Sequence, residues 1–382
     1  MKNKKTIKVA FPHMGNVYIA WAAALKKLGI EAIIPPKTSK KTLEMASKYS
    51  PESICLPYKT VLGNFLQAIE NGADYVAMIS SPGICILGEY GQSIKNILKD
   101  LGHEDKYIEL QLYDGFKGMY NFFTENLDAK NPVLIAKAIN IALRKIFVLD
   151  KLENLFSYYR AREVVVGTAE KHYNRALALI IDAENTKQLK QAQREAIEEI
   201  KKTEIDKNRD VLTVDITGEI FLVQDPFSNQ NIEKELGRMG VQTRRSLTVS
   251  GFIKDAIIPK AFKKGETHLE RAYRMARPYL MRDIGGDALE SVSDVAYANE
   301  KGTDGIIHVS PFTCMPEIMS QNIFPTMREN CEIPILTLIL DEQTGRAGYI
   351  TRLEAFADLM RRRKLYKKRQ AEQEKQKEVI QK

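Results

Sequence analysis

Short apolar runs alternate with amphipathic stretches at the start of the chain. Residues 7–12 (IKVAFP) are mainly apolar, residues 17–29 show helical periodicity, and residues 31–36 (EAIIPP) are again apolar. Short apolar runs bounded by turn residues are typical of buried strands, and a period of 3.6 residues is typical of a helix. The pattern therefore predicts a β-α-β unit, the building block of a parallel sheet.

The same alternation returns further along the chain, on either side of a long helical stretch. Residues 131–206 have helical periodicity and almost no glycine. Further apolar runs predict more strands; they lie at residues 73–80, 107–114, 211–223, 304–310 and 333–341. We therefore predict an α/β fold with two flavodoxin-like or Rossmann-like parallel-sheet lobes, separated by a helical block and followed by a basic helical tail.

These elements divide the chain into four segments. We expect an N-terminal α/β lobe over residues 1–130, a helical insertion over 131–208, a second α/β lobe over 209–350, and a C-terminal helix with a charged tail over 351–382. Much of the net charge of +8 lies in residues 361–382, where basic and acidic residues mix. Such mixing is typical of a solvated helix with a frayed end, and the chain lacks zinc fingers and aromatic RNA-binding signatures. Both features argue against nucleic acid as a partner.

The apolar runs are too short to cross a membrane. None approaches the roughly 20 residues that a membrane-spanning helix needs. The start, MKNKKTIKVAF, has lysines but no apolar segment of the kind found in signal peptides. We therefore expect a cytoplasmic protein, in which the four cysteines serve as thiols or metal ligands rather than in disulfides.

Two distant segments resemble one another. GADYVAMISSPGIC (residues 72–85) and GTDGIIHVSPFTC (residues 302–314) both run from Gly-x-Asp through an apolar strand to Ser-Pro-x-x-Cys. An internal duplication of one α/β unit accounts for the match, and chance is the alternative for so short a segment. We favour duplication.

Three of the four cysteines are predicted to share one edge of the fold. Ligands of open parallel sheets bind outside the carboxyl ends of the strands, and Cys85 and Cys314 both follow predicted strands. Cys55 precedes a helix that begins near Pro57, so its thiol faces the amide-rich start of that helix. Cys331 comes before its strand instead, which places it at the opposite edge.

Three separated thiols suit an iron-sulfur cluster better than zinc. Zinc usually takes four ligands, often as paired Cys-x2-Cys knuckles, and no such pair occurs here. A cubane held by three cysteines leaves one iron open to another donor or to a substrate. The alternative is three unrelated buried thiols, since free cysteine is among the most buried residue types. The prolines beside each cysteine loop favour a built site.

The sequence leaves the catalytic residues open. His13 follows the first strand and is a candidate proton donor, or alternatively a helix cap. Lys59, four residues after Cys55, is a candidate for lowering the pKa of that thiol, with a solvated lysine as the alternative. Glu342 follows a predicted strand and is a candidate proton relay or iron ligand, or alternatively part of a helix cap. No phosphate-binding glycine motif is present, so we expect any ATP to be hydrolysed by a partner.

Five further motifs occur in order along the chain: FPHMGN, YSPESICLPYKTVLGNF, GEIFLVQDPFSN, SPFTCMPEIM and LDEQTGRAGYITRLEAFADL. Together they resemble the 2-hydroxyacyl-CoA dehydratase superfamily, in particular its stand-alone, activase-related (CoA protein activase-like) branch. The resemblance implies flavodoxin-like domains with a helical insertion and a 4Fe-4S cluster on three cysteines. It also implies that an ATP-dependent activase supplies low-potential electrons, and that the cluster subunits work in pairs. One relative carries a bridged double cubane, so the resemblance leaves open a larger cluster.

The resemblance is uneven at the three cysteines. Cys55 and Cys314 match the cysteines of the family motifs Cys-Leu-Pro-[Phe/Tyr]-Lys and Pro-Phe-x-Cys-Met-Pro-Glu. Cys85 falls in GICILGEYG, where relatives have Gly-Pro-Cys-Arg-Phe-Gly-Tyr-Tyr-Gly, and Asp287 stands where relatives have a histidine. Two hypotheses follow. The first is a 4Fe-4S redox component that works with an activase or a second cluster subunit, as a homo- or hetero-oligomer. The second is a non-catalytic, partner-binding scaffold that retains the fold.

Overall fold

A computed structural model describes residues 6–80, 85–111, 114–257 and 265–380. In this part of the chain, the first lobe contains a four-stranded parallel sheet in the order β2-β1-β3-β4. Its strands are β1 (Lys8–Ala10), β2 (Glu31–Ala32), β3 (Tyr75–Ser80) and β4 (Tyr107–Gln111). Its helices are α1 (Tyr18–Lys27), α2 (Lys40–Ser47), α3 (Leu56–Glu70), the 3-10 turns η1 (Ile86–Glu89) and η2 (Glu104–Lys106), α4 (Tyr90–Asp100), α5 (Gly115–Asn121) and the π-helix η4 (Phe122–Asn126).

The second lobe contains a second four-stranded parallel sheet, in the order β6-β5-β7-β8. Its strands are β5 (Leu212–Gly218), β6 (Val241–Arg245), β7 (Gly305–Pro311) and β8 (Ile335–Leu340). Its helices are α9 (Ile220–Gln224), α10 (Ile232–Arg238), α11 (Val249–Ile257), α12 (His268–Ala276), α13 (Ala288–Glu300) and α14 (Met315–Met327). The predicted fold of two parallel-sheet lobes is confirmed.

Both sheets have the same strand order. In each lobe the second strand lies at one edge, followed by the first, the third and the fourth. The two similar segments of the sequence therefore contain the third strand of their lobes, β3 and β7. This equivalence supports an internal duplication, because a chance match would not have to fall on corresponding strands.

Alternate residues of the strands face opposite sides of each sheet. In the first lobe, Val9 and Ala77 pack in a core with α1 and α6, whereas Ala10 and Val76 pack in a core with α3 and α4. The second sheet likewise has separate cores on its two faces. Burial on both faces explains why most strands read as continuous apolar runs. The edge strand β6, with the sequence VQTRR, was not predicted because most of its residues are polar.

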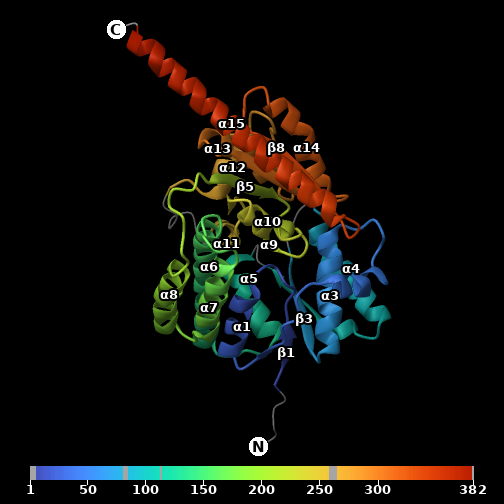
Figure 1. Cartoon of the computed structure of the whole chain (residues 1–382). Coiled ribbons are helices and arrows are strands. Elements are labelled where there is room, and N and C mark those ends of the chain that lie inside the picture. Colours follow the sequence, from blue (N-terminus) through green and yellow to red (C-terminus); the bar gives the residue numbers. More distant parts are fainter. Residues whose placement is uncertain (1–5, 81–84, 112–113, 258–264, 381–382) are drawn as a thin grey trace, which may run out of the picture.

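Three helices form a bundle that follows the first lobe in the chain. They are α6 (Pro132–Arg160), α7 (Thr168–Asp182) and α8 (Thr186–Lys201), and they share a core that also includes Ile19 of α1 (Figure 1). The last helix, α15 (Arg346–Ile380), lies against the second lobe and then projects beyond the body of the molecule (Figure 1). Its buried side chains end at Met360, and the basic segment beyond is largely exposed. The predicted helical tail is therefore present.

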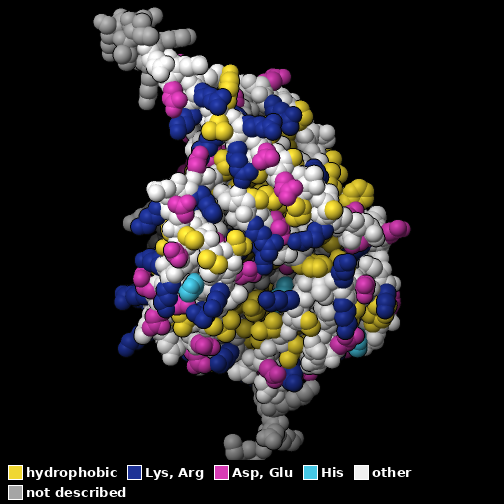
Figure 2. Space-filling model, viewed as in Figure 1, with side chains coloured by type: hydrophobic (Ala, Val, Ile, Leu, Met, Phe, Trp, Pro, Cys, Tyr) yellow, Lys and Arg dark blue, Asp and Glu magenta, His cyan; other side chains and the backbone are white. Residues whose placement is uncertain are grey.

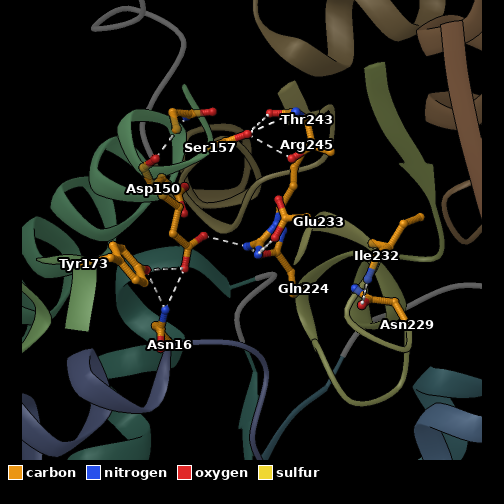
Figure 3. Close-up of polar contacts among 12 residues, drawn as sticks. Asn16, Asp150, Ser157, Tyr173, Gln224, Asn229, Ile232, Glu233, Thr243 and Arg245 are labelled. Carbon is orange, nitrogen blue, oxygen red and sulfur yellow. Dashed lines mark hydrogen bonds and ion pairs between the residues drawn. The ribbon is translucent and has the colours of Figure 1, made fainter. Parts of the chain in front are cut away.

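A partly buried network of ion pairs and hydrogen bonds joins the two lobes to the helical bundle (Figure 3). Arg245, at the end of β6, donates to Glu153 of α6 and Glu233 of α10, each at 2.6 Å. Asn16, which follows β1, donates to the same Glu153 at 2.8 Å and to the Tyr173 hydroxyl at 2.9 Å. The Glu153 carboxylate thereby links the bundle to both lobes, since Asn16 of the first lobe and Arg245 of the second lobe each donate to it.

The two lobes also meet near the carboxyl ends of their strands. Leu56, at the start of α3, packs in a core of the second lobe. The Thr313 hydroxyl donates to the Ser53 carbonyl at 3.0 Å, so the loop before α14 touches the loop before α3. On the face shown in Figure 2, basic and acidic side chains are interspersed rather than gathered by sign. No helix within the described residues is long and apolar enough to cross a membrane.

Candidate functional site

Three cysteines lie at the starts of three helices. Cys55 is the N-cap of α3, Cys85 of η1, which leads into α4, and Cys314 of α14. The sequence Cys-x-Pro begins both α3 and α14, where proline suits the first turn because it has no N–H to leave unpaired. In a β-α-β unit the helix begins at the carboxyl edge of the sheet. The predicted placement of these three cysteines at that edge agrees with the structure.

Close packing brings the loops of the three cysteines together. Gly286 has φ +62°, and a Cβ placed on it would lie 2.7 Å from Pro316 Cγ and 3.7 Å from Cys85 Cβ. Cys85 therefore lies beside the first turn of α14, which Cys314 caps. Because the hydrogen bond of Thr313 also joins this turn to the loop before Cys55, one region contains all three thiols.

A buried carboxyl group, Glu219, occupies the point where the strand order of the second sheet reverses. Gly218 ends β5 opposite Val309 of β7, with φ +124° and no room for a side chain. The following Glu219 donates its backbone N–H to the Val309 carbonyl at 3.1 Å. Its carboxylate accepts from the amides of Phe221 and Leu222 at 3.0 and 2.9 Å, which caps α9. Ligands commonly bind at such a switch point.

The α9 segment connects the thiols to a second carboxyl group. Phe221 of α9 packs in the same core as Cys55. The neighbouring Ile220 donates its backbone N–H to Asp287 at 2.9 Å, and Asp287 follows Gly286 in the chain. Glu219 therefore lies between the Cys55 side and the Cys85 side of the region.

Burial raises the pKa of all three thiols. The pKa of Cys55 rises to about 11, mainly because the thiol is desolvated. The pKa values of Cys85 and Cys314 are raised for the same reason, and the Glu219 carboxylate raises all three further. One amide in the first turn of each helix acts in the opposite direction and favours the thiolate. A positive charge among the thiols would instead lower their pKa values, because it favours the thiolate form.

The pKa values of two carboxyl groups in the region are raised as well. Burial, with the neighbouring Asp287 and Glu317 charges, raises the pKa of Glu219 to about 8. Burial and the Glu317 charge raise the pKa of Asp287 to about 7. At neutral pH Glu219 therefore keeps a proton that an exposed carboxyl would lose, and Asp287 titrates near neutral pH. The region is thus rich in groups that become anionic and poor in positive charge.

Glu317 extends the region into the interior of the second lobe. It lies in the first turn of α14, is fully buried, and contacts His308 Nε2. The Ser291 hydroxyl donates to the same oxygen of Glu317 at 2.9 Å. The other carboxylate oxygen and His308 Nδ1 have no hydrogen-bond partner among the described residues. These polar groups, like Glu219, were not singled out from the sequence.

The three candidate catalytic residues have structural partners. His13 Nε2 donates to the Pro35 carbonyl at 2.7 Å, and the His13 backbone N–H donates to Asn64 at 2.8 Å. The Lys59 ammonium is buried and forms an ion pair with Glu342 that joins the lobes. His13 therefore holds the loop after β1 against the Pro35 carbonyl and Asn64. The structure supports neither prediction for Lys59, because its ammonium pairs with Glu342 rather than Cys55 and is buried rather than solvated.

Cys331 lies at the opposite edge of the second sheet, as predicted. It follows α14 and packs in the core between α12, α13 and β7. The 13 residues of α14 span about 20 Å at 1.5 Å per residue. The Tyr279 hydroxyl lies 3.9 Å from its sulfur.

Sequence reasoning overlooked Glu219 and Tyr90, although both lie in segments that attracted attention. Glu219 belongs to GEIFLV, and its signal is its position directly after a buried strand and a glycine. Tyr90 belongs to GICILGEYG, and its hydroxyl lies 2.6 Å from the Cys55 sulfur. The contact between Tyr90 and Cys55 could not be read from the local pattern, because the two residues are 35 positions apart in the chain.

No group of three or more His, Cys, Asp or Glu side chains within the described residues is placed so that it could hold a metal ion. The thiols therefore share a region without forming a closed coordination sphere for a single ion.

Comparison with known proteins supports a relation to CoA enzyme activases at a coarse level. Residues 10–83 match the family described as CoA enzyme activase uncharacterised domain. This segment runs from the last residue of β1 past the end of β3 and includes Cys55 but neither Cys85 nor Cys314. No curated protein matches the chain significantly. The first lobe thus carries an activase-related domain.

Proposed function

We propose that this chain is an iron-sulfur protein of the 2-hydroxyacyl-CoA dehydratase type, with a 4Fe-4S cluster held by Cys55, Cys85 and Cys314. In this proposal an ATP-dependent activase, or a second cluster subunit, delivers low-potential electrons for a reductive or dehydratase-type reaction. The observation that supports it best is the convergence of three thiols at three helix starts around Glu219. The activase-related domain in the first lobe supports the partner.

The donor set fits such a group. Thiolates are the usual ligands of iron-sulfur clusters, and three of them leave one iron open. As thiolates, three desolvated sulfurs beside carboxyl groups would be costly without a compensating positive charge, and an iron cluster would supply that charge. A bound cluster would supply one-electron chemistry and an open coordination position.

The remaining groups have distinct tasks in this proposal. The helix starts orient the thiols, because backbone amides of the first turns face the sulfurs. Glu219 holds a proton on a carboxyl oxygen at neutral pH, and Asp287 can take up or release one near that pH, next to the thiols. The cores that contain Cys55 and Phe221 exclude water from one side.

The surface beside Cys314 suits a protein partner. Four large apolar side chains around the start of α14 are exposed: Phe312, Met315, Ile318 and Met319. Apolar side chains that gather on a surface are typical of interaction sites, and methionine adapts its shape to a partner. An activase or a second subunit that docks here would approach the thiols.

A second candidate function is a partner-binding scaffold without a cluster. It is favoured by the carboxyl groups of Glu219, Asp287 and Glu317, because each that ionises adds negative charge where a thiolate-bound cluster is already anionic. In a scaffold Glu219, whose pKa is raised to about 8, would stay protonated near neutral pH. The apolar surface at α14 would serve either function.

Anaerobic purification, followed by iron and sulfide analysis, distinguishes the two functions. We expect brown protein with roughly four iron and four sulfide per cluster. Replacing Cys55, Cys85 or Cys314 with serine should each lower the iron content and the visible absorption. Cys331→Ser is the matched control and should leave both unchanged, since Cys331 lies at the other end of α14. Colourless protein after anaerobic reconstitution would favour the scaffold.

A further inference from the structure

The Tyr90 hydroxyl is directed at the sulfur of Cys55. Tyr90 is the first residue of α4 and is 2% exposed. Its oxygen lies 2.6 Å from Cys55 Sγ, and within the described part of the chain this sulfur is its hydrogen-bond partner. A tyrosine hydroxyl is protonated at neutral pH, because its ordinary pKa is near 10. It can therefore donate its proton to the sulfur whenever Cys55 is a thiolate.

The ring of Tyr90 is held in place independently of this hydrogen bond. It packs edge-on against Tyr58 of α3, with the ring centroids 5.0 Å apart. Both rings belong to the buried core that contains Cys55, Val61 and Phe65. Because the ring is fixed by packing, loss of the hydroxyl alone should leave it in place. The contact is thus a fixed feature of the core.

A buried hydrogen bond to a ligating sulfur has a defined chemical effect. It withdraws negative charge from the sulfur and so favours the state with more electrons on the metal group. Hydrogen bonds to the sulfurs are one of the factors that set the reduction potential of iron-sulfur clusters. The effect is strong where the contact is shielded from water, as here.

We propose that Tyr90 is a positioning residue that stabilises the Cys55 thiolate and raises the reduction potential of the group that this thiolate holds. The second part rests on the proposed function, whereas the first concerns the chain alone. Tyr90 also links the loops of two of the three cysteines, because it follows Cys85 in η1–α4 and contacts Cys55 at the start of α3. It thereby fixes the Cys55 sulfur relative to the helix that Cys85 precedes.

Tyr58 provides a matched control. It is fully buried in the same core and also uses its hydroxyl in a hydrogen bond, but the partner is Ser93 Oγ at 2.7 Å. Tyr58→Phe and Tyr90→Phe therefore each remove one buried hydroxyl and keep the ring. Only Tyr90→Phe removes a contact to sulfur.

The first test uses the protein without any cluster. The rate at which iodoacetamide labels Cys55 at one fixed pH, followed by peptide mass spectrometry, reports how strongly the thiolate form of this sulfur is favoured. We expect slower labelling of Tyr90→Phe than of the wild-type protein, and no change in Tyr58→Phe. Equal rates in the two variants would overturn the proposal. Because no cluster is needed, this result does not depend on the proposed function.

The second test uses protein reconstituted anaerobically with iron and sulfide. A redox titration followed by electron paramagnetic resonance should give a more negative potential for Tyr90→Phe than for the wild type and Tyr58→Phe. A potential that is unchanged, or shifted equally in both variants, would overturn the tuning role. If Tyr90→Phe does not fold, 3-fluorotyrosine introduced at position 90 is the alternative. It is a stronger donor of nearly the same shape and should shift the potential in the positive direction.

Discussion

Replacing Glu219 with glutamine tests whether a carboxyl group is held among the thiols. Glu219 is 8% exposed, and burial together with the Asp287 and Glu317 charges raises its pKa from 4.5 to about 8. Between these two pH values the folded chain keeps a proton that the unfolded chain has lost. The contribution of Glu219 to stability is therefore most favourable below pH 4.5 and declines as the pH rises towards 8.

The size of this effect follows from the width of the pH window. Each pH unit within it costs about 1.4 kcal/mol of stability. From pH 5 to pH 8 the penalty from Glu219 grows to about 4 kcal/mol, a large fraction of the roughly 5–15 kcal/mol that stabilises a typical protein. Glutamine has nearly the same size and carries no charge, but it keeps one oxygen where the two α9 amides use both carboxyl oxygens. Glu219→Gln should therefore carry a loss that does not depend on pH, and its stability relative to the wild-type protein should rise by up to about 4 kcal/mol between pH 5 and pH 8.

Urea denaturation of metal-free, reduced protein, followed by circular dichroism between pH 5 and pH 8, measures this difference. Glu163→Gln is a suitable control. Glu163 is also buried and accepts hydrogen bonds from two backbone amides, those of Gly167 and Ala169, but it lies in the helical bundle. A pH-dependent gain in stability that Glu219→Gln shows and Glu163→Gln lacks is therefore due to the groups around Glu219. If the stability of Glu219→Gln followed that of the wild type in parallel at every pH, the grouping of Glu219 with the thiols and carboxyl groups would be wrong.

Two further substitutions test the packing around the site. Arg245→Met should lower the free energy of unfolding by about 3–5 kcal/mol in urea, because it leaves two buried carboxylates without their cation; Arg244→Met should cost much less, since its buried partner keeps Lys301. Similar losses would contradict the central role of Arg245. Gly286→Ala should lower thermal stability by about 1–3 kcal/mol, because its φ is +62° and the added methyl group meets the first turn of α14. Gly345→Ala, with open space around it, is the control, and an equal effect of both changes would refute the packing argument.

The local pattern of the sequence determined the type of fold and part of the site. Apolar runs and helical periodicity depend on neighbouring residues, so they predicted both sheets and the helical stretch between them. The sequence also predicted the helix that begins near Pro57, and so placed Cys55 at a helix start, whereas it predicted only that Cys314 follows a strand. The sequence also predicted the position of Cys331. This residue comes before β8, and residues before a parallel strand lie at the sheet edge opposite its carboxyl end.

Tertiary structure alone decided which side chains from different segments meet. Tyr90 reaches Cys55, Lys59 reaches Glu342, and Arg245 of the second lobe reaches Glu153 of the helical bundle. These contacts connect residues 35 to 283 positions apart, so no local periodicity signals them. The pKa values of the Glu219 carboxyl and the thiols could not be predicted from the sequence for the same reason. The residue type sets only the starting pKa, whereas burial and neighbouring charge depend on how the lobes are assembled.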